Sequence, residues 1–198
     1  MYDLKPAFQH LLQPGIDILA KAGVTPNQVT VAAALLSCAL GTLIMAFPAA
    51  RWPLLVIPPG LLLRMALNAI DGVLARAYKM QSPLGGLLNE LGDVCSDAAV
   101  YLPFALLPGV PAHLVVLVVV LGIIGEMAGV LAVQIGAGRR YDGPMGKSDR
   151  ALVFGVLALL LGFGVTAGAW IFSLLLIITG LQALTIVNRT RAALRQVS

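Results

Sequence analysis

The chain has 198 residues, of which 59% are hydrophobic and only 11% are charged, and its mean hydropathy is +0.94. These values exclude an ordinary soluble domain, and the sequence contains several apolar runs of the roughly 20 residues that cross a bilayer. We therefore predict an all-α integral membrane protein. The net charge of +4 suits anionic lipid headgroups or an anionic substrate, whereas no basic soluble region is present to bind nucleic acid.

Residues 1–23 predict an amphipathic helix that lies in the membrane interface. Its apolar residues recur at helical spacing, at Leu4, Phe8, Leu11, Leu12, Ile16 and Leu19. We expect the helix to bend at Pro14 and to end at Gly23, because glycine tolerates the left-handed backbone of a helix end. An ordinary packed helix is the alternative. The first 20 residues lack the continuous apolar run of a cleavable signal peptide.

Six apolar segments follow over residues 28–190, separated by breaks rich in proline or glycine. The segments are Gln28–Phe47, Trp52–Arg76, Leu84–Leu107, Val110–Ala137, Asp149–Val165 and Ala169–Asn188. Their length and composition predict membrane-spanning helices. We therefore predict one membrane-embedded domain over residues 1–198, with six transmembrane helices.

Basic residues predict the orientation of this bundle. In a six-span arrangement, one side holds Lys5, Lys21, Arg76, Lys79, Arg139, Arg140, Lys147, Arg150, Arg189, Arg191 and Arg195. The opposite side has only Arg51 in a loop, and Arg64 lies within the second segment. Because cytoplasmic loops carry an excess of lysine and arginine, we expect both termini in the cytoplasm of a bacterial inner membrane.

Small residues in the first segment suggest helix association. Ala33, Ser37 and Gly41 repeat at four-residue spacing, which lets two transmembrane helices approach closely. A homodimer is therefore a further expectation. Cys38 and Cys95 lie in apolar stretches and are expected to be free thiols.

Polar side chains gather in the second and third segments, although a charge at the centre of a span costs about 2.5–3.5 kcal/mol. Asn68 and Asp71 share one helix face, and Asn89, Asp93 and Asp97 form a second stripe. Oxygen donors on converging helices suit a hard divalent cation such as Mg²⁺, with phosphate oxygens completing its shell. A structural polar network that packs the helices is the alternative.

The stretch from Asn68 to Asp93 resembles the signature of the CDP-alcohol phosphotransferases, D-x2-D-G-x2-A-R-x8-G-x3-D-x3-D. Every interval is preserved, through Asn68, Asp71, Gly72, Ala75, Arg76, Gly85, Asn89 and Asp93. The segment TPNQVT at residues 25–30 resembles the part of the family that precedes the first span. The predicted six spans and interfacial helix also match the family.

This resemblance implies a reaction in which an alcohol displaces CMP from a CDP-linked donor, usually CDP-diacylglycerol, with Mg²⁺ or Mn²⁺ as cofactor. It implies metal ligands at Asn68, Asp71, Asn89 and Asp93, and Asp97 is a candidate for supplying further charge. It also implies that Asp93 is the general base. The nucleotide is expected to contact Asn27, Thr30, Gly72, Ala75, Arg76 and Gly85.

Asn68 and Asn89 stand where the family has aspartates, so two of the four signature carboxylates remain. This favours one metal ion over two, since uncompensated buried charge is costly. A catalytically silent relative that binds nucleotide or lipid is the alternative function. A small transporter is a third class, and Glu126 in the fourth segment is the residue that best fits it. We expect Glu126 to pair with a basic or polar neighbour instead.

A second basic cluster follows in the stretch GRRYDGPMGKSDR and at the end of the sixth segment. Arg139, Lys147, Arg150 and Arg189 are candidates for binding a phosphorylated acceptor such as glycerol phosphate or inositol phosphate. Ser148 is expected to cap the fifth segment and to place Arg150 near a helix N-terminus, where anions are favoured. Positive-inside topology with lipid headgroup contact is the alternative.

Overall fold

The computed structural model of the chain describes residues 4–197, with side chains from Leu12 onward. Its helices are α1 (Leu4–Lys21), α2 (Pro26–Ala46), α3 (Trp52–Ala77), α4 (Pro83–Tyr101), η1 (Leu102–Leu106), α5 (Ala112–Leu131), η2 (Ala132–Ile135), α6 (Lys147–Gly162) and α7 (Ala169–Val197). No β-strand occurs within residues 4–197, which confirms the all-helical prediction. Residues 1–3 and the side chains of Leu4, Phe8 and Leu11 lie outside the described part.

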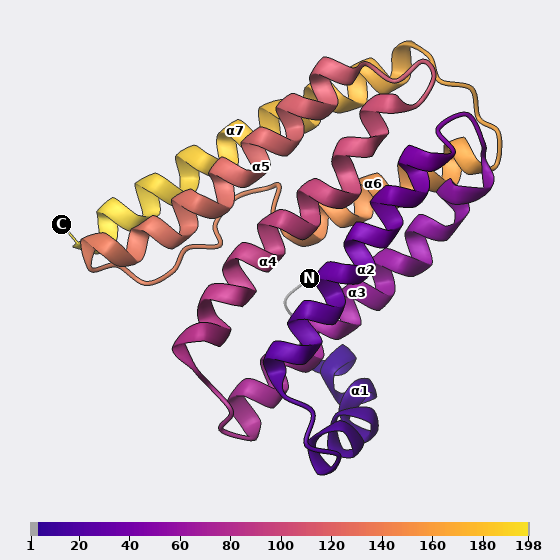
Figure 1. Ribbon diagram of the computed structural model, residues 1–198. Helices are drawn as coiled ribbons and strands as arrows, with labels where there is room; N and C mark the ends of the chain where they lie inside the picture. The colour runs from indigo at the N-terminus through magenta and orange to yellow at the C-terminus, as the bar shows by residue number, and fades with distance from the viewer. Residues whose placement is uncertain (1–3, 198) are drawn as a thin grey trace.

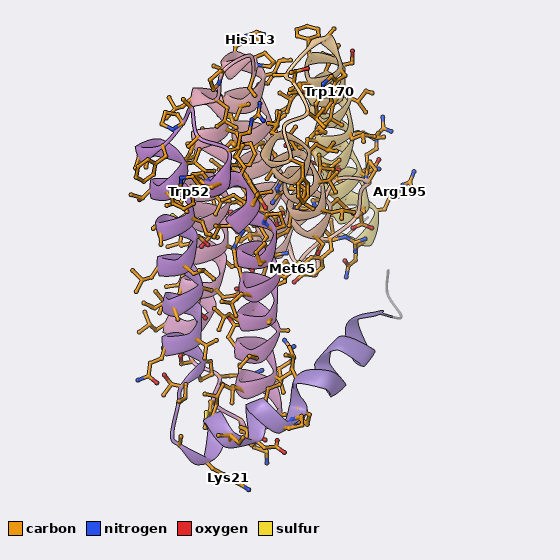
Figure 2. All side chains as sticks on the ribbon, turned by 90° about the vertical axis from the view of Figure 1, so that its right-hand side faces the viewer. Lys21, Trp52, Met65, His113, Trp170 and Arg195 are labelled. Carbon is orange, nitrogen blue, oxygen red and sulfur yellow. The ribbon has the colours of Figure 1, made fainter. Side chains whose placement is uncertain are left out.

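Helices α2 to α7 run alongside one another as an elongated bundle, and α1 lies across one end (Figure 1). Three short connections, at residues 47–51, 107–111 and 163–168, gather at the opposite end. There, a Cβ placed on Gly109 would lie 2.8 Å from Ala167, and one on Gly164 would lie 2.7 Å from Arg51. His113 and Trp170 mark this end in Figure 2, whereas Lys21 marks the end from which α1 projects. Consecutive helices of the bundle, from α2 to α7, therefore run in opposite directions.

In the described part of the chain, four helical segments are long and apolar enough to cross a membrane: Pro26–Ala46, Trp52–Ala77, Ala112–Ile135 and Ala169–Val197. The other two long bundle helices differ from this pattern. Helix α6 has only 16 residues, and α4 carries Glu90, Asp93 and Asp97 within its 19 residues. The structure thus supports four of the six predicted spans by length and composition, and a count of six stays a prediction.

The ends of several helices differ from the predicted segments. The third segment does not continue as α-helix to Leu107, because the chain tightens into η1 at Leu102, where Pro103 has no N–H to donate. The fifth begins at Lys147, and the Gly146 N–H donates to Asp149 Oδ2 at 2.9 Å. The side chain of Asp149, and not that of the predicted Ser148, therefore accepts the hydrogen bond that caps the start of α6.

Other helices also end at residues that differ from the predicted ones. Helix α7 continues past the predicted Asn188 to Val197. The fourth segment is divided, since α5 ends at Leu131 and η2 follows. Pro14 lies inside α1, which ends at Lys21, and Gly23 then adopts a φ of +75°. The expectation of a glycine turn after α1 is thus met two residues beyond the helix.

The stripe of small residues on α2 packs within the chain. Ala33, Ser37 and Gly41 are all buried, and a Cβ on Gly41 would lie 1.9 Å from the carbonyl oxygen of Ala99 on α4. Helices α2 and α4 therefore approach through this glycine. The prediction that the stripe faces a second chain was wrong, because α4 already covers it.

Among the side chains described from Leu12 onward, helix α1 contacts the bundle through an apolar cluster and a hydrogen bond. Ile16 packs with Val29 and Leu74 in a small core, and the Tyr78 hydroxyl donates to Asp17 Oδ1 at 2.5 Å. The bond from Tyr78, together with one from Gln13, lowers the pKa of the Asp17 carboxyl below its usual value. The N-terminal helix is thus fixed at the end of α3 that carries the signature.

We predict that Gly41→Leu destabilises the fold, because a larger residue forces α2 and α4 apart. Overpacking of a tight contact costs about 1–3 kcal/mol or more, so the unfolding temperature in detergent should fall by several degrees. Gly180→Leu is the matched control, since a Cβ at Gly180 meets nothing within 4 Å. Equal unfolding temperatures for the two variants would contradict the close approach.

Candidate functional site

A cleft of about 330 Å³ lies where the start of α2, the end of α3 and the start of α4 meet. All six residues predicted to contact a nucleotide line it: Asn27, Thr30, Gly72, Ala75, Arg76 and Gly85. Asp71 and Asn89 from the predicted metal set line the same cleft. Residues spread over more than 60 positions of the sequence thus converge on one space.

Local capping explains why two helices begin at this cleft. The Thr25 side chain accepts from the Gln28 N–H at 3.3 Å, and the Gln28 side chain accepts from the Thr25 N–H at 2.9 Å, which forms a capping box. Ser82 caps α4 by accepting from the Gly85 N–H at 3.0 Å. Pro26 and Pro83 occupy the first helical positions, as expected after such caps. Both N-termini face the cleft, and such ends favour anions.

Two glycines keep the cleft open. A Cβ on Gly85 would lie 2.8 Å from Asn27 Oδ1, and one on Gly72 would lie 2.9 Å from Arg76 Nη2. Contacts below 3 Å are not tolerated by a fixed Cβ, so a larger residue at either position pushes a cleft side chain aside. Steric crowding by Arg76 and Asn27 therefore explains why the signature has glycine at positions 72 and 85.

Asp71 joins α2 to α3 at the wall of the cleft. The Thr30 hydroxyl donates to Asp71 Oδ2 at 2.8 Å, and the Asp71 side chain is only 5% exposed. A buried carboxylate is retained only where partners compensate its charge. The hydrogen bond orients the carboxylate toward the space that the nucleotide is predicted to occupy.

Asp93 lies beside the cleft and does not line it. Its Oδ1 forms an ion pair with Lys147 and accepts a long hydrogen bond of 3.4 Å from Asn68 Nδ2. The Arg64 guanidinium also donates to the Asp93 backbone carbonyl at 3.3 Å. Asn68 on α3 and Asp93 on α4 are therefore in contact, as expected for converging polar stripes. They do not line the cleft that Asp71 and Asn89 line.

Asp97 is engaged in the interior of the bundle. Its Oδ1 lies 2.6 Å from Arg64 Nη2, and its Oδ2 accepts from Arg150 at 2.7 and 3.0 Å. Both carboxylate oxygens thus face guanidinium groups, and the residue is only 6% exposed. In this structure Asp97 links α3, α4 and α6, and neither of its oxygens is free for a metal.

Glu126 on α5 pairs with basic residues, as the sequence predicted. Its carboxylate lies 3.1 Å from Arg150, 3.3 Å from Arg189 and 3.5 Å from Arg139. Arg189 also donates to the Gly125 carbonyl oxygen at 2.6 Å. Arg150 and Arg189 are therefore buried components of the helix interface, with 3% and 2% exposure.

Arg139 contacts Glu90 with both donors of its guanidinium fork. Its Nε lies 2.5 Å from Glu90 Oε1, and its Nη2 lies 2.6 Å from Glu90 Oε2. The Arg139 Cζ atom also lies 4.4 Å from the centre of the Tyr141 ring. Burial opposes the charge, but the bonds to Glu90 raise the pKa of Arg139 above its usual value. All four predicted acceptor residues thus contact a carboxylate.

Glu90 and Arg64 were not among the predicted site residues. Glu90 lies on α4 next to Asn89, and its carboxylate pairs with Arg139 from the segment between η2 and α6. Arg64 sits in the apolar second segment, and a lone arginine there was itself a signal of a buried partner.

Divalent cation binding requires oxygen ligands. Of the five predicted metal ligands, Asp71 and Asn89 line the cleft, whereas Asn68, Asp93 and Asp97 do not. Among the described side chains, from Leu12 to Val197, no group of three or more acidic, histidine or cysteine residues is placed to hold a metal. Asp71 contributes a carboxylate to the cleft and Asn89 an amide oxygen. This donor set fits a cation held jointly with substrate phosphate oxygens, which is the usual binding mode of Mg²⁺.

Comparison with known proteins matches the chain to a family over most of its length. The sequence model of the CDP-alcohol phosphatidyltransferase family matches residues 23–182. The inner membrane protein YnbA of Escherichia coli (strain K12) is 45% identical over 196 residues, which cover 98% of this chain and 96% of that protein.

Solved structures share the fold. The phosphatidylinositol phosphate synthase of Mycobacterium tuberculosis with CDP-DAG bound superposes with a TM-score of 0.75 at 18% identity, covering 95% of this chain and 94% of that chain. The same enzyme with manganese and citrate gives a TM-score of 0.75 at 19% identity, covering 91% and 88%.

We predict that Asp71→Asn weakens metal-dependent nucleotide binding at least tenfold, because it removes the one carboxylate that lines the cleft while keeping its shape. Calorimetric titration of CMP in detergent with Mg²⁺ measures the affinity. Asp142→Asn is the control, since Asp142 pairs with Arg140 outside the cleft. Unchanged CMP affinity in folded Asp71→Asn would remove Asp71 from the site.

Proposed function

The chain belongs to the CDP-alcohol phosphatidyltransferase family, and from this premise we propose that it transfers a phosphatidyl group from CDP-diacylglycerol to an alcohol and releases CMP in phospholipid biosynthesis. The observation that carries the proposal is the cleft that all six predicted nucleotide contacts line. The relative of the same fold that binds CDP-DAG supports this class of donor.

In this proposal, the backbone and Arg76 bind the diphosphate. The N-termini of α2 and α4 favour anions at the cleft, and Arg76 adds a full positive charge there. Gly72 and Gly85 leave room for the nucleotide to approach the helices. The acyl chains of the donor remain in lipid, while its CDP group enters the cleft.

A divalent cation, Mg²⁺ or Mn²⁺, is the proposed cofactor, and the relative that contains manganese supports it. Asp71 and Asn89 would hold the ion together with phosphate oxygens of the donor. When bound, the ion supplies charge neutralisation for the departing CMP. With Asp71 as the one carboxylate lining the cleft, a single ion suits the site best.

Asp93 is the proposed general base. The acceptor oxygen forms a bond to the donor phosphorus, the bond from that phosphorus to CMP breaks, and the hydroxyl proton passes to the Asp93 carboxylate. The ion pair with Lys147 and the bond from Asn68 orient this carboxylate. Lys147 thereby acts as a positioning residue for the base in this proposal.

We further propose that the protein resides in a bacterial inner membrane with six spans, and that the cleft and both termini face the cytoplasm. The relative named as an inner membrane protein supports the location. Helices α4 and α6 lie among four helices of transmembrane length, which supports counting them as spans. The excess of basic residues at the cleft end supports the orientation.

The deciding experiment measures CMP release from CDP-diacylglycerol by purified protein with Mg²⁺ and a panel of alcohols. We expect CMP and a new lipid of matching mass. The alternative of a silent relative rests on Asn68 and Asn89, and it predicts that CMP binds while no alcohol yields CMP release.

We predict that Asp93→Asn lowers turnover by about 100-fold or more, a common loss when a general base is removed. Donor affinity should change little, because Asp93 does not line the cleft. Initial rates and CMP titrations on the same preparation separate the two effects. Near-normal turnover would assign proton removal to another group.

We predict that the double variant Asn68→Asp with Asn89→Asp binds more divalent metal than the wild type. Asn68 lies 3.4 Å from Asp93, and Asn89 lines the cleft with Asp71, so each change places two carboxylates close together. A second cation relieves their repulsion. Calorimetric titration of Mg²⁺ or Mn²⁺ with CMP present gives the stoichiometry. Two ions per chain in the wild type would contradict the charge argument.

A further inference from the structure

Five cations and four carboxylates form one ionic cluster between helices α3 to α7. Ion pairs join seven of them, and the Lys147–Asp93 pair is connected to these by the bond from Arg64 to the Asp93 carbonyl oxygen. The cations are Arg64, Arg139, Lys147, Arg150 and Arg189, and the carboxylates are Glu90, Asp93, Asp97 and Glu126. Each cation lies within ion-pair distance of at least one of these carboxylates. The cluster therefore carries a formal charge of +1, although its basic residues alone would carry +5.

The inner part of the cluster is closed to a bound anion. The side chains of Arg150 and Arg189 are 4% and 3% exposed, and both contact Glu126. A phosphate would have to enter the interior of the bundle and separate these pairs. Only Arg139 and Lys147, at 20% and 28% exposure, are reachable from solvent.

The reachable cations are already occupied by carboxylates. Glu90 holds Arg139 through two short bonds in the bidentate geometry that a phosphate would also use. Lys147 is paired with Asp93. A phosphate at this place competes with both carboxylates, and each one that it displaces is left half-buried without its cation, which is costly.

The formal charge of the cluster also disfavours a bound phosphate. A phosphate monoester brings nearly two negative charges, which would change the formal charge of the cluster from +1 to about −1. An uncharged hydroxyl compound leaves it unchanged. Arg139 Nη1 is buried with no hydrogen-bond partner within the described residues, so the bonds to Glu90 and Glu126 are the side-chain contacts that compensate this guanidinium.

We propose that the acceptor of this enzyme is an alcohol without a phosphate group, and that Glu90 determines this choice by occupying Arg139. The inference rests on the proposed function and replaces the phosphorylated acceptor expected from the basic residues alone. In the absence of Glu90, the same arginine would present a free fork to an anion.

The first test is acceptor competition in the wild type. Glycerol and inositol are offered at equal concentration with glycerol 3-phosphate and inositol phosphate, together with CDP-diacylglycerol, and the lipid products are identified by mass. We expect products of the uncharged alcohols to exceed the phosphorylated ones at least tenfold. Preferential use of a phosphorylated acceptor would overturn the proposal.

The second test does not depend on turnover, so it separates this proposal from the proposed function. Binding of inorganic phosphate is titrated with wild type, Glu90→Gln and Asp142→Asn in detergent. We expect about tenfold tighter binding in Glu90→Gln, given the strength of a charged hydrogen bond. Asp142→Asn is the matched control for freeing an arginine fork. Arg140 lies outside the cluster and still donates to Gln196 after this change, so its gain in phosphate binding should be clearly smaller than that of Glu90→Gln.

The outcomes are distinguishable. Phosphate binding in folded Glu90→Gln that equals the wild type overturns the inference, as does an equal gain in Asp142→Asn. If Glu90→Gln does not fold, Glu90→Asp shortens the carboxylate and should still increase phosphate binding over the wild type. Absence of CMP release with every alcohol would reject the proposed function, while the phosphate titrations still decide the role of Glu90.

Discussion

The fold depends on how charged side chains are compensated inside an apolar bundle. Asp97 sits between Arg64 and Arg150, and Glu126 sits between Arg150 and Arg189, so that α3, α4, α5, α6 and α7 share one continuous set of ion pairs. Removing one partner would leave a buried charge, which is strongly destabilising. These pairs restrict how the helices rotate and slide, and they fix the side of α4 that faces the cleft.

The same pairs connect the interior to the candidate site. Arg64 contacts Asp97 through one nitrogen atom and also donates to the carbonyl oxygen of Asp93. Lys147 begins α6 and reaches the Asp93 side chain. The proposed base is therefore held by groups that also hold the bundle, so its orientation follows from helix packing and not from a flexible loop.

The sequence predicted the local parts of this arrangement and missed the long-range ones. Helical spacing predicted which polar residues share one face of a helix, such as Asn89 and Asp93, because that is a local property. The common nucleotide site of residues 27–30, 72–76 and 85 was implied by the family resemblance. The partner of Asp97 was not predictable in this way, since Arg64 and Arg150 lie on other helices far away in sequence. For the same reason, Gly41 read as a contact between chains, when it faces Ala99 of its own chain.

The two capped helices at the cleft have a consequence for how the site tolerates mutation. Each helix N-terminus acts as about half a positive charge that belongs to peptide groups and not to any side chain. Thr25 and Ser82 cap these two helix ends, and Ser82 together with Pro26, the residue after Thr25, lines the cleft. Since no single substitution can delete a peptide dipole, attraction for anions is the most durable property of the cleft, and it outlasts changes in the side chains that perform chemistry.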